Sequence, residues 1–117
     1  MTMGAVNVIW QGDANNCIIR ALSLAASPPA ILNVTSRKTL RVRDIAQRIG
    51  AVLGKEPRFT SREAPTSLLS NASKCVERFG EPAVSLDEMI GAIVTWVTAG
   101  KPILNKPTKY NVRDGRF

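Results

Sequence analysis

A short apolar segment precedes a helical pattern in the stretch Val8-Ile9-Trp10-Gln11-Gly12-Asp13-Ala14-Asn15. Asp13 is a residue type that caps helices, because its carboxylate accepts hydrogen bonds from free backbone N–H groups. Pro28-Pro29 ends the helical pattern, whose apolar members recur at Cys17, Ile18, Ala21, Leu22 and Ala25. The stretch therefore predicts a strand followed by a helix.

The clearest helical pattern covers residues 42–53. Its apolar face consists of Val42, Ile45, Ala46, Ile49, Val52 and Leu53. Gly54 follows and is suited to the left-handed conformation in which many helices end. The polar side chains expected on its solvent side are Arg41, Arg43, Gln47 and Arg48.

The last helix has a complete start signal. Ser85 and Glu88 have the spacing of a capping box, and Val84 and Met89 occupy the two positions of a hydrophobic staple. Its expected buried stripe is Leu86, Met89, Ile90, Ile93, Val94 and Val97, and Gly100 with Pro102 stops it. We therefore expect the helix to begin directly after Ser85.

Weaker signals complete the fold class. Ser70 or Asn71 can open a short helix that carries Cys75 and is closed by Gly80. Residues 30–34 and 58–60 are expected to form short strands. The sequence predicts an α+β fold of about four helices with a few short strands.

Length and composition indicate one domain. The chain has 117 residues, of which 44% are hydrophobic and 21% are charged, as in ordinary globular proteins. We expect a single domain over residues 1–100 and an extended tail over residues 101–117. No apolar run approaches the roughly 20 residues of a membrane span, and the start lacks the pattern of a signal peptide. The expected location is the cytoplasm.

Two cysteines and the lack of histidine limit the chemistry. Cys17 and Cys75 both lie in apolar helical patterns, and the sequence contains no histidine. A thiolate–imidazole nucleophile and the usual zinc ligand sets are therefore excluded, and no metal site is expected. We interpret both cysteines as reduced thiols in the core.

Four blocks of sequence share their order and spacing with a known enzyme family. They are residues 8–15, residues 31–35 with 39–46, residues 71–80, and residues 82–96. These blocks resemble the extended short-chain dehydrogenase/reductases, the NAD-dependent epimerase/dehydratase family, and together they span about residues 6–100. The resemblance is to the C-terminal, substrate-binding region. It implies NAD as the cofactor of the full-length family.

The departures from that family limit what the chain is expected to do alone. Only seven residues precede Val8, too few for a Rossmann half. The sequence lacks the Gly-rich turn that holds a dinucleotide, and Tyr110, its sole tyrosine, has Asp114 where the family has a lysine. We expect no catalytic and no cofactor-binding residue here. The expected partner is a nucleotide-binding Rossmann half, from the same gene or a separate chain, and a homodimer is a further possibility.

Substrate contacts are expected at four residues: Trp10, Gln11, Arg37 and Arg62. Trp10 offers a stacking surface and Gln11 an amide, although a tryptophan beside Ile9 also suits a core. Val6 stands where many sugar-nucleotide epimerases have an arginine that pairs with the substrate diphosphate, which weakens a UDP-sugar assignment. The expected ligand is an anionic or sugar-type small molecule.

The basic balance supports an alternative function. The chain has 16 Lys and Arg against 9 Asp and Glu, and eight of the cations fall between Arg37 and Arg62: Arg37, Lys38, Arg41, Arg43, Arg48, Lys55, Arg58 and Arg62. This excess is typical of a solvated helix face, of an anion-binding site, or of nucleic-acid binding. The few aromatic residues argue against nucleic acid. A stand-alone basic binding module remains the alternative.

Overall fold

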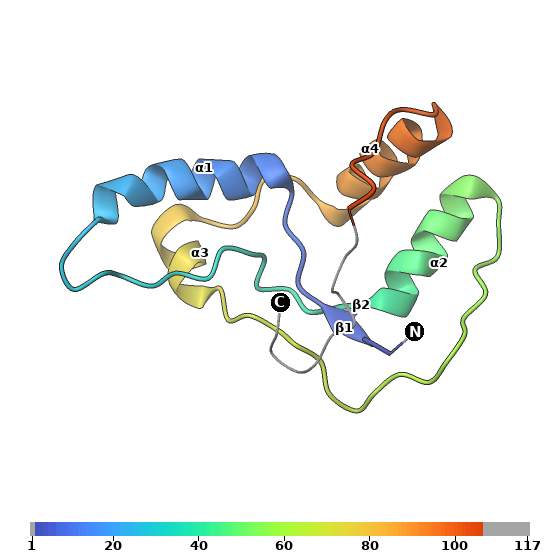
Figure 1. Cartoon of the computed structure of the whole chain (residues 1–117), viewed down its shortest axis with the longest axis horizontal. Helices are drawn as coiled ribbons and strands as arrows, with labels where there is room; N and C mark the ends of the chain where they lie inside the picture. The colour runs from blue at the N-terminus through green and yellow to red at the C-terminus, as the bar shows by residue number, and fades with distance from the viewer. Residues whose placement is uncertain (1, 107–117) are drawn as a thin grey trace.

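The computed structural model describes residues 2–106, which form four α-helices and a two-stranded sheet (Figure 1). The α+β class with four helices is confirmed. The elements in chain order are β1 (Ala5–Val6), α1 (Gln11–Ala21), a 3₁₀ turn (Leu22–Leu24), β2 (Leu40–Arg41), α2 (Val42–Leu53), α3 (Ser73–Phe79) and α4 (Leu86–Thr98).

The small sheet joins the beginning of the chain to α2. β1 and β2 are antiparallel, with Ala5 opposite Arg41 and Val6 opposite Leu40. The N–H of Val42 extends this pairing by donating to the Gly4 carbonyl at 3.0 Å. Because α2 begins at Val42, the sheet fixes where this helix starts.

Two helix pairs lie on either side of the sheet. α1 packs against α3, and α2 packs against α4 (Figure 1). The buried side chains follow the same division, since Cys17 and Cys75 belong to the first pair and Met89, Ile90 and Val94 to the second. The described residues include no buried polar or charged side chain.

The expected end of α2 and the expected start of α4 are confirmed. Gly54 adopts a left-handed φ of 63° and ends α2, and the N–H of Lys55 returns to the Gly50 carbonyl at 2.8 Å. The Ser85 hydroxyl accepts from the Glu88 N–H at 3.3 Å, while the Glu88 carboxylate accepts from the Ser85 N–H at 2.7 Å. These bonds form the expected capping box.

The expected role of Asp13 as the cap of α1 is wrong. The helix begins two residues earlier, at Gln11, and the residue at its N-cap, Trp10, makes no side-chain capping bond. Asp13 lies in the first turn, and its carboxylate accepts a hydrogen bond from the Val84 N–H at 3.0 Å. The carboxylate therefore serves a tertiary contact, because Val84 lies 71 residues further along the chain.

Two of the expected strands are wrong, and the opening strand lies earlier than expected. Residues 30–34 and 58–60 have no strand conformation. The opening strand is Ala5–Val6, and the expected strand residues 8–10 are not part of it. A strand needs a neighbouring backbone, and none pairs with residues 30–34 or 58–60 in the part of the chain that the structure describes. Side-chain amides bridge some of these segments instead: Asn33 donates to the Asn71 carbonyl at 3.0 Å.

The helices bury less apolar surface than their patterns predict. Val52 and Leu53 of α2 and Ile93 and Val97 of α4 were expected in the core and are exposed. The radius of gyration is 16.2 Å, against roughly 13 Å for a compact domain of this length. Because the two helix pairs are spread apart, much of each apolar face stays uncovered.

Arg43 was expected to face solvent, and it does not. Its guanidinium lies 4.1 Å from the centre of the Phe59 ring and 3.0 Å from a carboxylate oxygen of Glu63, and its side chain is half-buried. These contacts hold the loop after α2 against the helix.

The remaining boundaries depend on short-range contacts. α3 begins at Ser73, later than expected, although the Asn71 side chain accepts from the Ser73 N–H at 3.0 Å. Residues 101–106 have no regular structure, and the Trp96 indole donates to the Pro102 carbonyl at 3.0 Å. The rest of the expected tail, residues 107–117, lies outside the described residues.

Over residues 2–106, none of the helices combines the length and apolar character needed to cross a membrane.

Candidate functional site

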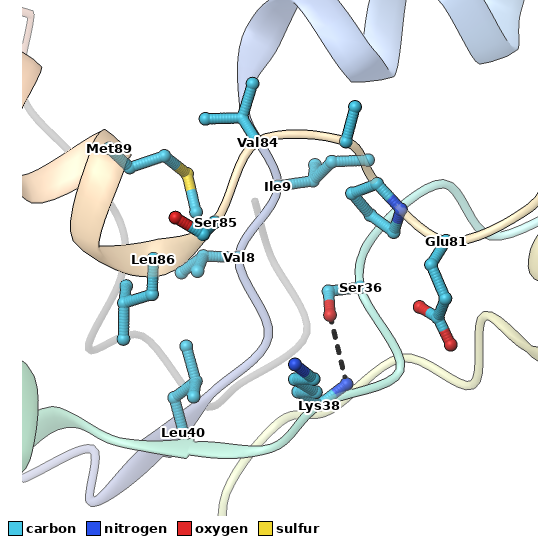
Figure 2. Close-up of a pocket in the computed structure, with 12 residues that line it drawn as sticks. Val8, Ile9, Ser36, Lys38, Leu40, Glu81, Val84, Ser85, Leu86 and Met89 are labelled. Carbon is cyan, nitrogen blue, oxygen red and sulfur yellow. Dashed lines mark hydrogen bonds between the residues drawn. The ribbon is translucent and has the colours of Figure 1, made fainter.

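A hollow of about 300 Å³ lies where three segments meet (Figure 2). The segment before α1 supplies Val8 and Ile9. Ser36 and Lys38 come from the segment leading into β2, and Leu40 from β2 itself. The loop after α3 and the first turn of α4 supply the rest. That last group comprises Glu81, Pro82, Ala83, Val84, Ser85, Leu86 and Met89. The hollow therefore joins residues that lie far apart in the sequence.

One part of the wall is apolar. Val8, Leu40, Leu86 and Met89 gather there (Figure 2), and the Met89 side chain is buried while the other three are half-buried. Apolar surfaces of this kind stack against the carbon faces of sugar rings and other small molecules.

The other part of the wall carries polar groups. Lys38 contributes an ammonium group, and its backbone N–H donates to the Ser36 hydroxyl at 3.1 Å (Figure 2). Glu81 contributes a carboxylate, which accepts from the Arg37 guanidinium at 2.9 Å. The ammonium of Lys38 is the group in this wall that suits an anion.

Ser85 is occupied by the capping box of α4. Its hydroxyl accepts a hydrogen bond from the Glu88 N–H. Hydrogen bonding of the Glu88 carboxylate with the side chain and the backbone of Ser85 lowers the pKa of this carboxyl. Glu88 is therefore ionised at neutral pH and holds the first turn of α4. This turn carries Leu86 and Met89 into the wall of the hollow.

Asp13 positions the same loop from the opposite side. Its carboxylate accepts from the Val84 N–H, and Val84 lines the hollow. The loop 80–85 is thus held at one point by α1 and at its end by α4.

The four residues expected at the site are not brought together in this wall. Trp10 is half-buried at the start of α1, with its ring against Gly12, and Gln11 is exposed in the first turn. Arg37 reaches the edge of the hollow through its ion pair with Glu81. Arg62 is exposed in the loop before α3. None of these four lines the hollow.

Sequence reasoning missed Lys38 and Glu81 as site residues. Lys38 was counted only as one cation of a basic segment, and Glu81 was not singled out. Gly80 and Pro82 on either side of Glu81 mark a loop, which is the signal that could have drawn attention to this carboxylate.

The basic segment is partly neutralised by carboxylates. Arg37 pairs with Glu81, Arg43 with Glu63 at 3.0 Å, and Arg48 with Asp87 at 2.8 Å. The two exposed pairs, Arg37–Glu81 and Arg48–Asp87, contribute little to stability. All three pairs reduce the positive charge that the surface presents. The remaining five cations of the segment have no ion pair within residues 2–106: Lys38, Arg41, Lys55, Arg58 and Arg62.

The carboxylate and the two hydroxyls of the hollow all have hydrogen-bond partners. Its carboxylate is paired with Arg37, and its Ser36 and Ser85 hydroxyls accept backbone hydrogen bonds. Cys17 and Cys75 are free and buried, as expected. In the described part of the chain, no group of three or more His, Cys, Asp or Glu side chains is placed to hold a metal ion.

Comparison with solved structures shows a fold similarity. The chain superposes on UDP-glucuronic acid 4-epimerase from Bacillus cereus, solved in complex with NAD, with a TM-score of 0.66 and 16% sequence identity. The match covers 86% of this chain and 33% of the epimerase chain, so this chain spans about one third of that enzyme's length. No protein-family model matches the sequence, and no curated protein sequence matches it. The fold is therefore similar to one part of this epimerase chain.

Proposed function

We propose that this chain is the substrate-binding part of an enzyme similar to NAD-dependent epimerases/dehydratases. The fold match to one third of UDP-glucuronic acid 4-epimerase carries the proposal. The order and spacing of the four sequence blocks support it, because they point to the substrate-binding region of the same family. In this proposal, the chain corresponds to the small, C-terminal domain of such enzymes.

The proposed ligand is an anionic or sugar-type small molecule bound in the hollow beside Lys38. The ammonium of Lys38 would pair with the negative charge, and Leu40 and Met89 would pack against the carbon skeleton. Lys and Arg are the usual partners of phosphate and carboxylate groups. A few polar groups set in an apolar wall are typical of small-molecule sites.

In this proposal, the chain does not transfer hydride by itself. A dinucleotide is held by a Gly-rich turn at a helix N-terminus, which the sequence lacks. NAD would be bound by a nucleotide-binding half, which supplies the redox chemistry. The residues described here bind and orient the substrate.

Isothermal calorimetry with UDP-glucuronic acid tests the proposal. The wild-type chain should bind it saturably, and Lys38→Met should weaken binding about tenfold, equivalent to 1.4 kcal/mol. Lys55→Met is the matched control, since Lys55 is exposed and lies outside the hollow. Equal losses in both variants would mean that general charge attracts the ligand. Saturable binding of NAD alone would contradict the expected lack of a cofactor site.

The exposed apolar side chains support the proposal that this chain has a partner. Ile31 is 81% exposed and Leu22 is 74% exposed near α1, and Val97 is 58% exposed on α4. Large exposed apolar side chains that lie together often form an interface. We place the nucleotide-binding half there, and expect two copies of the chain to associate when that half is missing. Sedimentation should show a dimer, and a monomer at every concentration would contradict this expectation.

The alternative function is a stand-alone basic module, and the five cations without ion pairs favour it. Retention on double-stranded DNA that falls steeply with salt would support it. The substrate-binding proposal predicts no retention at physiological salt. Calorimetry and DNA retention therefore separate the two functions.

A further inference from the structure

Two buried cysteines lie in the contact between α1 and α3. Cys17 is 9% exposed on α1 and Cys75 is 3% exposed on α3. Arg20, one turn after Cys17, donates to the Phe79 carbonyl at 3.0 Å and lies 4.7 Å from the centre of the Phe79 ring. Phe79 is one turn after Cys75. Because residues three and four apart share a helix face, the two thiols lie on the faces that these helices press together.

The thiols also act on each other. Burial raises the pKa of the Cys75 thiol, and charge repulsion and a hydrogen bond with Cys17 raise it further, while the Arg20 cation opposes the shift. Cys75 is therefore mostly protonated at neutral pH. A protonated thiol is a poor nucleophile, so Cys75 should react slowly with peroxide.

A small surface hollow is lined by one of the two cysteines. It has a volume of about 60 Å³ and is lined by Cys17, Arg20, Asp13 and Phe79, among others, but not by Cys75. A water molecule occupies about 30 Å³, so a molecule the size of hydrogen peroxide fits.

We propose that Cys17 and Cys75 form a modification site, a dithiol that hydrogen peroxide oxidises to a disulfide between α1 and α3. The Cys17 thiolate attacks one peroxide oxygen, the O–O bond breaks, and the departing hydroxide takes up a proton to become water. The resulting Cys17 sulfenic acid is then attacked by Cys75, whose proton leaves with the displaced hydroxide as a second water. Two thiols lose two electrons and two protons, and the peroxide is reduced to two waters.

The crosslink would act on the candidate site. α3 leads through Gly80 into the loop that carries Glu81 and Val84, and α1 carries the Asp13 carboxylate that holds the Val84 N–H. A disulfide fixes these two helices to each other and closes a long loop of chain, which reduces the entropy of the unfolded state. The oxidised chain should therefore melt at a higher temperature than the reduced chain.

Peptide mapping of the peroxide-treated chain tests the proposal. Trypsin cuts after Arg20, Lys74 and Arg78, which places Cys17 in residues 1–20 and Cys75 in residues 75–78. We expect these two peptides to be joined and two hydrogens lighter than their sum. The thiol count in denaturant should fall from two to zero per chain and return with dithiothreitol.

The order of attack is tested with dimedone, which traps sulfenic acids. In wild type at short times, and in Cys75→Ser at all times, the adduct should appear on Cys17. Cys17→Ser should keep a free Cys75 thiol. Wild type that retains two thiols, links only between chains, or forms its first adduct on Cys75 would overturn the proposal. Because the wild-type measurement suffices, a variant that fails to fold leaves the test intact.

Discussion

The carboxylate of Asp13 accepts a hydrogen bond from the backbone N–H of Val84 at 3.0 Å, which ties the first turn of α1 to the loop before α4. Asp13 is half-buried, and Val84 lines the hollow of the candidate site. One bond therefore connects the two helix pairs and positions a wall of the site.

Replacing Asp13 with alanine should lower the free energy of unfolding by about 1.5–3 kcal/mol, the range for a hydrogen bond to a charged group. Asp13→Asn keeps an acceptor oxygen and should lose less. Asp44→Ala is the control, since Asp44 is in the first turn of α2 and is exposed. Urea melts measure all three. Equal losses for Asp13→Ala and Asp44→Ala would show that only the helix dipole matters.

Loss of the Ser85 hydroxyl should destabilise the chain by about 1 kcal/mol, the usual size for an N-cap. The Ser85 hydroxyl accepts the Glu88 N–H at 3.3 Å, which alanine cannot do. Ser85→Asp keeps an acceptor and should stay close to wild type. If Ser85→Ala is as stable as wild type in denaturant melts, this capping bond does not stabilise the helix.

The Glu88 carboxylate should make stability depend on pH in the acid range. Its hydrogen bonds with Ser85 lower its pKa in the folded chain, so the folded state binds this proton less readily than the unfolded state. The stabilisation is present above the unfolded pKa of about 4.3, and is lost as pH falls through the lower, folded pKa. Glu88→Gln should lack this component, so its stability should approach that of wild type as the pH is lowered. A constant difference between the two across this range would contradict the assignment.

Gly50 and Gly91 should respond in opposite directions to alanine. A Cβ at Gly50 would lie 2.4 Å from the Lys55 carbonyl oxygen and 2.9 Å from Pro57 Cδ, because the chain after α2 folds back over this position. Gly50→Ala should therefore cost about 1–3 kcal/mol. At Gly91 the added Cβ would meet no atom within 4 Å apart from its chain neighbours and the backbone of its own helix, so Gly91→Ala should gain about 0.5–1 kcal/mol. Thermal melts in which Gly50→Ala is neutral would show that this turn is not closed.

The hollow of the candidate site could not be predicted from the sequence. The Glu81 carboxylate accepts a hydrogen bond from the Arg37 guanidinium, although the two residues are 44 positions apart in the sequence. Lys38 lines the hollow because the chain passes it on the way into β2. Such pairings depend on which loops meet, and periodicity carries no information about that. Trp10 and Gln11 were chosen for their chemistry, and the structure places Gln11 on the exposed side of α1.

The sequence by itself determined the helices whose signals are local. Ser85 with Glu88 sets the start of α4, and Gly54 sets the end of α2, because each signal acts through bonds within about one helical turn. Only the tertiary structure decided the strands, the partner of Asp13 and the exposure of the apolar faces. A strand needs a neighbour and a buried face needs a covering element, and both come from parts of the chain that are distant in sequence. For that reason residues 30–34 carry an apolar pattern and yet remain unpaired in the described chain.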